Sequence, residues 1–262
     1  MKEEIRVFFT ALMFYTRIPC PSWVDHSAEY LNKATRYFPM MGWIVGGFSA
    51  LILAGAMLIL PIPVAVILSI VASIYLTGAF HEDGFADVCD GYGGGWTSEK
   101  ILEIMKDSRV GAYGVVGFVL LMSLKITSLM ALGQAGMLTV VLAVWIAHSL
   151  SRWMATWMIF RMPYARANED SKAKPVAKGM ETSSLLFASI FGWGPILIGG
   201  WLISPYWYLV PIPMLLMQGF LGKKYMKWTN GYTGDGLGAV QQATEVVAYM
   251  AMLVPLHLAT MA

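Results

Sequence analysis

Long apolar stretches alternate with polar connections along the whole chain. A helix that crosses a bilayer needs about 20 predominantly apolar residues, and the stretches of that kind are 38–60, 62–80, 110–132, 137–160, 183–203, 206–221 and 239–261. The sixth is the shortest, and Pro205, Pro211 and Pro213 predict that it is kinked or broken. The pattern predicts an all-α, polytopic membrane helix bundle, which we expect to be one domain over residues 1–262 with about seven transmembrane helices.

Two shorter segments are predicted to be helices that do not cross the bilayer. Residues 5–18 are too short to span, are rich in Phe and Leu, and carry Arg6 and Arg17 near their ends. This composition predicts an N-terminal helix that lies at the membrane interface or packs on the bundle. Residues 97–107 begin with Thr97 or Ser98 as a good N-cap and then follow an amphipathic pattern. They are expected to form a short cytoplasmic helix.

The connections predict which ends of the spans share a side of the membrane. Those near Pro61, Gln134 and Ser204 are short and uncharged, whereas 81–109, 161–182 and 222–238 are long and polar. Apart from Lys125 and Arg152, all of the 18 lysines and arginines lie in the long connections or the N-terminal segment. Because loops rich in Lys and Arg stay in the cytoplasm, we expect the N-terminus and long loops to be cytoplasmic and the C-terminus to lie across the membrane.

The composition agrees with a membrane protein and excludes several other classes. Hydrophobic residues make up 57% and charged residues 13% of the 262, with a mean hydropathy of +0.61. Soluble domains carry roughly 25% charged residues, so a soluble globule and a disordered chain are both excluded. Two cysteines exclude a disulfide scaffold and are expected to be free thiols. A net charge of only +2 argues against nucleic acid as a partner.

An acidic cluster follows the second apolar stretch directly and contains Glu82, Asp83, Asp87 and Asp90. If the helix continues through Asp90, the three aspartates are spaced i, i+4, i+7 and stack on one face. Like charges at the C-terminal end of a helix repel one another and are disfavoured by the helix dipole. A hard divalent cation with oxygen ligands would stabilise them. The alternative is a solvated helix end, and the neighbouring His81 is a ligand, a proton donor or a plain interfacial histidine.

Glycines and cations come next along the chain. Three consecutive glycines, which include Gly93 and Gly94, predict a helix break and a close approach of the backbone to a ligand. Lys106 and Arg109 then precede the third apolar stretch. They are candidates to hold a phosphate, with Arg109 as a bidentate fork, or else they anchor the span at the membrane surface.

Two further arginines are candidate substrate ligands. Arg152 follows His148 by one turn inside the fourth apolar stretch, so it faces the bundle or snorkels to the interface. Arg166 lies in a basic loop that would attract an anionic substrate or anionic lipid headgroups.

A single carboxylate lies among glycines at the start of the last apolar stretch. Asp235 stands between Gly234 and Gly236. It is an N-cap of the following helix, a further metal ligand or a general base. The flanking glycines favour close approach of a ligand.

Carboxylates that hold a metal beside a glycine loop and basic residues are typical of phosphoryl transfer. The sequence contains no Ser/His/Asp set and no P-loop lysine pattern, which favours direct transfer over a covalent enzyme intermediate. The alternatives are a lipid synthase similar to the CDP-alcohol phosphotransferases, whose motif is not intact here, and a cation-coupled transporter. A transporter would need ionisable groups near the midplane of several spans.

The combined motifs resemble the cobalamin synthase family over nearly the whole chain. The acidic segment is the most specific of them. The matching segments are 14–19, 37–39, 81–91, 105–114, 163–166 and 233–239.

This resemblance implies a multi-pass enzyme of the bacterial inner membrane that requires Mg²⁺. It implies transfer between adenosylcobinamide-GDP and α-ribazole or its 5′-phosphate, giving adenosylcobalamin or its phosphate, and GMP. The C-terminus would then be periplasmic. A homo-oligomer stays open, because the Trp and Met content of the spans leaves room for subunit contacts.

The resemblance and the residue types together assign candidate roles. The metal ligands are Glu82, Asp83, Asp87 and Asp90, which would hold one or two Mg²⁺ ions on the diphosphate. The catalytic groups are Lys106 and Arg109, which stabilise charge on the GMP side, and Asp235 or His81 as the base. The remaining substrate-binding candidates are Arg152, Arg166, Gly93, Gly94, Gly234 and Gly236.

Overall fold

A computed structural model describes residues 2–24, 27–165 and 179–261. Within these ranges the chain is almost entirely helical, which confirms the all-α prediction. The α-helices are α1 (Lys2–Tyr15), α2 (Ala28–Ala34), α3 (Phe38–Met57), α4 (Ile62–Thr77), α5 (Phe80–Gly94), α6 (Ser98–Ile104), α7 (Ala112–Gln134), α8 (Met137–Arg161), α9 (Thr182–Leu202), α10 (Pro211–Thr229) and α11 (Gly234–Met261). Two 3₁₀ turns, η1 (Thr35–Tyr37) and η2 (Pro205–Leu209), precede α3 and α10.

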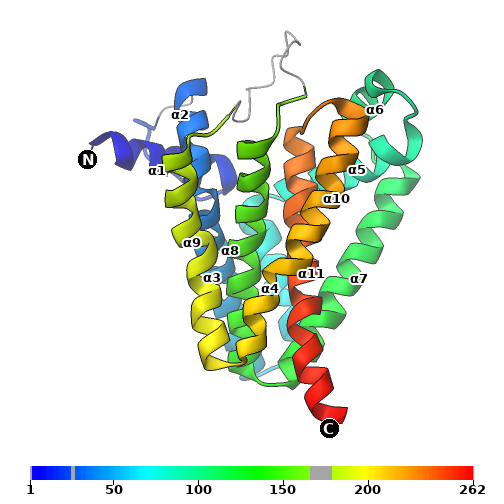
Figure 1. Ribbon diagram of the computed structural model, residues 1–262. Coiled ribbons are helices and arrows are strands. Elements are labelled where there is room, and N and C mark those ends of the chain that lie inside the picture. Colours follow the sequence, from blue (N-terminus) through cyan, green and yellow to red (C-terminus); the bar gives the residue numbers. More distant parts are fainter. Residues whose placement is uncertain (1, 25–26, 166–178, 262) are drawn as a thin grey trace.

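The long helices form an upright bundle with α8 and α11 at its centre (Figure 1). The helix α8 packs against α3, α9 and α11, and α11 also packs against α5, α7 and α10. The N-terminus, α6 and the start of α11 lie at one end of the bundle, and the C-terminus lies at the other (Figure 1). The long connections therefore gather at one end, as the alternation of loop lengths predicts. We call this the loop end.

The predicted number of seven spans is reached only if shorter helices are counted. In the described part of the chain, five helices are long and apolar enough to cross a membrane by themselves, and α4 with α5 would add a sixth as a bent pair. The sixth predicted stretch is indeed broken, into η2 and α10. The helix α10 fails the criterion because its last two turns carry Lys223, Lys224 and Lys227.

The second predicted span does not continue into the acidic cluster. The helix α4 ends at Thr77, and α5 starts at Phe80 after a bend of 90°. Gly78 and Ala79 both have left-handed backbone (φ 68° and 60°), which ends α4 and turns the chain. The second apolar stretch therefore does not continue as one helix, although Asp83, Asp87 and Asp90 share the new helix α5. Glu82 and Asp83 lie in the first turn of a new helix, where the helix dipole stabilises carboxylates.

Both short helices are present. The N-terminal helix α1 is shifted by three residues toward the N-terminus relative to the predicted range 5–18. Its Glu3 and Glu4 form ion pairs with Lys33 and Arg36, at 2.8 and 2.7 Å. In α6 the Thr97 hydroxyl accepts the Lys100 backbone N–H and caps the helix, as predicted.

Candidate active site

The acidic helix α5 and the last helix α11 touch at two glycines of the loop end. A Cβ atom on Gly84 would lie 2.9 Å from the Cα atom of Asp235, and one on Gly238 would lie 3.1 Å from the carbonyl oxygen of His81. Only glycine allows two backbones to approach so closely. The contact brings Asp235 beside the acidic cluster, although about 150 residues separate them in the sequence.

The four carboxylates of the cluster point in different directions. Glu82 and Asp90 are buried, whereas Asp83 is exposed and Asp87 is half-buried. Across residues 2–24, 27–165 and 179–261, no group of three or more His, Cys, Asp or Glu side chains forms a preformed metal site. The outward-facing carboxylates of α5 are therefore Asp83 and Asp87, which lie one turn apart.

Asp90 has a structural role that the sequence did not predict. Its carboxylate accepts the backbone N–H groups of Gly111 and Gly114 at 2.7 and 2.8 Å. These groups belong to the N-terminus of α7, where a carboxylate satisfies unpaired N–H groups and the helix dipole. Asp90 thus joins α5 to α7.

Asp235 is not the N-cap of α11. The Thr233 hydroxyl accepts the backbone N–H of Gly236 at 3.0 Å and takes that role. The carbonyl oxygen of Gly236 in turn accepts the hydroxyl of the buried Tyr225 at 3.1 Å. Gly234 and Gly236 are therefore part of the first turn of the helix. Asp235 lies between them and is half-buried.

A backbone pairing joins two of the predicted motifs. Ala165 N–H donates to the Tyr232 carbonyl at 2.8 Å, and Tyr232 N–H donates to the Pro163 carbonyl at 3.0 Å. This pairing holds the segment after α8 against the glycine loop before α11. Arg166 follows immediately but lies outside the described residues, so its predicted role stays a prediction.

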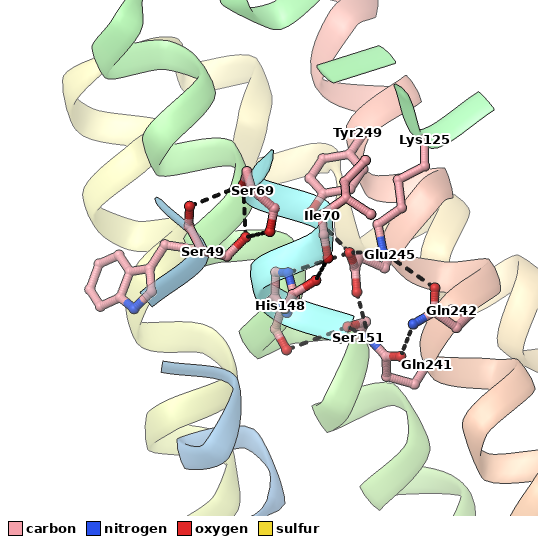
Figure 2. Close-up of polar contacts among 12 residues, drawn as sticks. Ser49, Ser69, Ile70, Lys125, His148, Ser151, Gln241, Gln242, Glu245 and Tyr249 are labelled. Atoms are coloured by element: carbon pink, nitrogen blue, oxygen red, sulfur yellow. Dashed lines mark hydrogen bonds and ion pairs between the residues drawn. The ribbon is translucent and has the colours of Figure 1, made fainter. Parts of the chain in front are cut away.

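Below the acidic helix, the bundle interior holds a buried polar network centred on Glu245 of α11 (Figure 2). Lys125 of α7 forms an ion pair with Glu245 at 2.7 Å, and His148 Nε2 of α8 lies 3.5 Å from it. Tyr249 and Gln241 donate hydrogen bonds to the same carboxylate at 3.0 and 2.5 Å. A buried carboxylate is tolerated because these groups offset the loss of hydration.

The network extends from Glu245 to α5. Gln242 donates to Glu82 Oε1 at 2.9 Å and accepts from Lys125 at 3.3 Å. Arg152 is only 2% exposed and donates to the His148 carbonyl at 2.9 Å. The guanidinium therefore faces the bundle, and the snorkelling alternative is wrong. Glu82 is connected to the interior rather than directed at the loop-end surface.

His81 is buried between helices. Its ring stacks on Phe38 with 5.5 Å between centroids and 8° between planes. The Arg152 guanidinium lies over the same Phe38 ring at 5.7 Å. His81 is 2% exposed, whereas Asp235 is half-buried.

The cations after α6 are at the surface. Lys106 is exposed, and Arg109 forms an ion pair with Asp107 at 2.6 Å. The Arg109 guanidinium lowers the pKa of Asp107 to about 2. Of the glycines before α6, Gly93 packs against the Tyr113 ring and Gly94 is exposed. Lys106, Arg109 and Gly94 are thus accessible at the loop end, whereas Arg152 lies inside the bundle.

A family model described as cobalamin-5-phosphate synthase matches residues 7–253. The chain belongs to the cobalamin-5-phosphate synthase family. The match confirms the resemblance drawn from the motifs and covers nearly all of the described helices.

Curated relatives agree with this family assignment. A protein of Shewanella frigidimarina named adenosylcobinamide-GDP ribazoletransferase is 42% identical over 251 residues, which cover 96% of this chain and 95% of the relative. Proteins of the same name from Leptospira interrogans and Shewanella woodyi are 38% and 40% identical, and each comparison covers 97% of both chains. No solved structure matches the chain.

In this member of the cobalamin-5-phosphate synthase family, sequence reasoning missed the buried network. Lys125, His148, Gln241, Gln242 and Glu245 are visible as polar residues in or beside apolar stretches. The signal for their pairing is that ionisable groups inside a span need partners in neighbouring helices. Which helices are neighbours is a tertiary property.

Proposed function

We propose that the protein joins adenosylcobinamide-GDP to α-ribazole or its 5′-phosphate with release of GMP. The observation that carries the proposal is the likeness to relatives of that name at 38–42% identity over nearly the full length. In the reaction, the ribose 3′-hydroxyl attacks the phosphorus that is bonded to the cobinamide aminopropanol. A new O–P bond forms, the bond from that phosphorus to the bridging oxygen breaks, and GMP leaves.

The test is an incubation of detergent-purified protein with Mg²⁺, adenosylcobinamide-GDP and α-ribazole. We expect GMP and adenosylcobalamin in equal amounts, measured by chromatography. A parallel incubation with α-ribazole 5′-phosphate gives the phosphorylated product if that substrate is accepted. Absence of GMP with both acceptors would contradict the proposal and would favour a lipid synthase or a transporter.

The carboxylates at the loop end fit Mg²⁺ by their donor chemistry. Asp83 and Asp87 offer oxygen ligands one turn apart on α5, and the contact at Gly84 places the start of α11 beside them. These two residues would hold the ion, while Glu82 and Asp90 hold α5 in place from its buried side. When bound, Mg²⁺ neutralises charge on the diphosphate and on the leaving GMP.

Asp235 is the proposed general base. Its half-buried carboxylate takes the proton of the ribose 3′-hydroxyl as the O–P bond forms. Lys106 and Arg109, exposed at the same end, attract the anionic substrate, and Arg109 exchanges Asp107 for phosphate.

An Asp235→Asn variant tests this role. We expect kcat to fall by about 10²–10⁴-fold, because the amide cannot accept the proton. The Mg²⁺ concentration that gives half-maximal rate should stay unchanged. A marked rise in the Mg²⁺ requirement would instead make Asp235 a metal ligand.

The proposed location is the bacterial inner membrane, with the loop end in the cytoplasm and the C-terminus in the periplasm. The concentration of lysines and arginines in the connections of the loop end supports this orientation. It also gives the site access to nucleotide-bearing substrates, which are cytoplasmic.

A further inference from the structure

A second polar site lies on the outside of the bundle, between the ends of α8 and α10. A cleft of about 490 Å³ opens there between the last turn of α8 and the second half of α10. Trp157 and Arg161 line it from α8, and Gln218, Gly219 and Lys223 line it from α10. None of these residues belongs to the acidic helix or to the loop of Asp235.

The polar groups of this cleft suit an anion. Arg161 and Lys223 are both exposed, and neither forms an ion pair with a residue of the described ranges. The Arg161 guanidinium lies 5.6 Å from the Trp157 ring centroid, which orients it along the cleft wall. Two cations that line one cleft from different helices are suited to hold a phosphate group.

The cleft also contains a buried polar side chain. Gln218 is 8% exposed and lines the cleft, and it makes no hydrogen bond within the part of the chain that the structure describes. The amide of Gln218 reaches the open cleft rather than being enclosed by protein. A ligand with ester or hydroxyl oxygens below its phosphate would satisfy this amide.

The face of α10 below the cleft is apolar. Ile212 and Leu215 precede the cleft residues on the same helix face and are 55% and 38% exposed. A Cβ atom on Gly219 would meet nothing within 4 Å, so the groove beside it is open. The cations lie toward the loop end, and the apolar surface lies toward the middle of the membrane. This polarity matches an amphiphile rather than a soluble phosphate.

We propose that the cleft between α8 and α10 binds an anionic phospholipid. Arg161 and Lys223 hold the headgroup phosphate, and Gln218 bonds the glycerol or ester region. One acyl chain follows the groove past Gly219. The site is independent of the proposed transferase chemistry.

Native mass spectrometry of the detergent-purified protein tests the site, with phosphatidylglycerol and phosphatidylcholine of identical acyl chains as probes. We expect one phosphatidylglycerol to bind in preference to phosphatidylcholine. In the Arg161→Gln/Lys223→Gln double variant the phosphatidylglycerol Kd should rise by about 25-fold, because each cation contributes about fivefold. Lys227→Gln, a matched exposed lysine of α10 outside the cleft, should bind like the unaltered protein.

Gly219→Leu tests the groove separately from the charges. The leucine fills open space on an exposed helix, so the fold is retained, and phosphatidylglycerol binding should fall although both cations remain. Undiminished binding in this variant or in the double variant would overturn the proposal. Displacement of phosphatidylglycerol by millimolar inorganic phosphate would also overturn it, because the site would then serve a free phosphate. None of these readouts depends on GMP release.

Discussion

Replacing Asp87 by Asn lowers the rate of GMP release by about 10²–10³-fold, the loss expected when one electrostatic partner of the transition state is removed. Asp87 is half-buried on the outward face of α5, one turn from Asp83. Asn keeps the size of the side chain and removes the charge that we propose binds Mg²⁺. The measurement is the initial rate across a Mg²⁺ titration. The elution volume and helical content should not change.

Glu99→Gln is the matched control for this variant. Glu99 is an exposed carboxylate in the first turn of α6, close to the site in sequence but not part of it. Its replacement should leave the rate unchanged. A fully active Asp87→Asn protein would overturn the assignment of α5 as the metal-binding helix, whereas equal losses in both variants would indicate a general effect of charge.

Replacing Glu245 by Gln destabilises the whole bundle. The buried ammonium of Lys125 loses the carboxylate that lies 2.7 Å away, while the size of the side chain and one of its two acceptor oxygens are kept. An uncompensated buried charge costs about 3–5 kcal/mol. For a chain of this size, the midpoint of thermal denaturation in detergent should fall by roughly 6–20 °C.

The Lys125→Met/Glu245→Gln double variant separates charge pairing from packing. Since both members of the pair become neutral, the double variant should recover a large part of the lost stability. If the stability lost in the double variant equalled the sum of the losses in the two single variants, Lys125 and Glu245 would not be energetically coupled. The network would then stabilise the bundle through packing and not through charge pairing.

The acidic cluster shows how far sequence reasoning reaches. The i, i+4, i+7 spacing of Asp83, Asp87 and Asp90 placed all three on one helix, and they do share α5. The prediction that these carboxylates form one set of metal ligands did not include the helices that pack around α5. Asp90 meets the N-terminus of α7, an element that starts more than 20 residues later, and so becomes an anchor.

The bend before α5 was predictable in part. Gly78 is a local signal for a helix end, because glycine adopts the left-handed conformation without strain. The apolar run through Phe80 concealed it. Ala79 also has positive φ, which no local rule predicts, so the 90° turn depends on the packing around it.

The sequence by itself determined the all-α membrane class, the end of the bundle that carries the loops, and the family, and it offered candidate residues for metal and phosphate binding. These properties follow from local composition, periodicity and contiguous motifs. Only the tertiary structure decided that Glu82 and Arg152 face the interior, that Lys125 pairs with Glu245, and that Asp235 lies beside α5. The physical reason is that burial and pairing depend on contacts between helices far apart in the chain, and no local pattern encodes them.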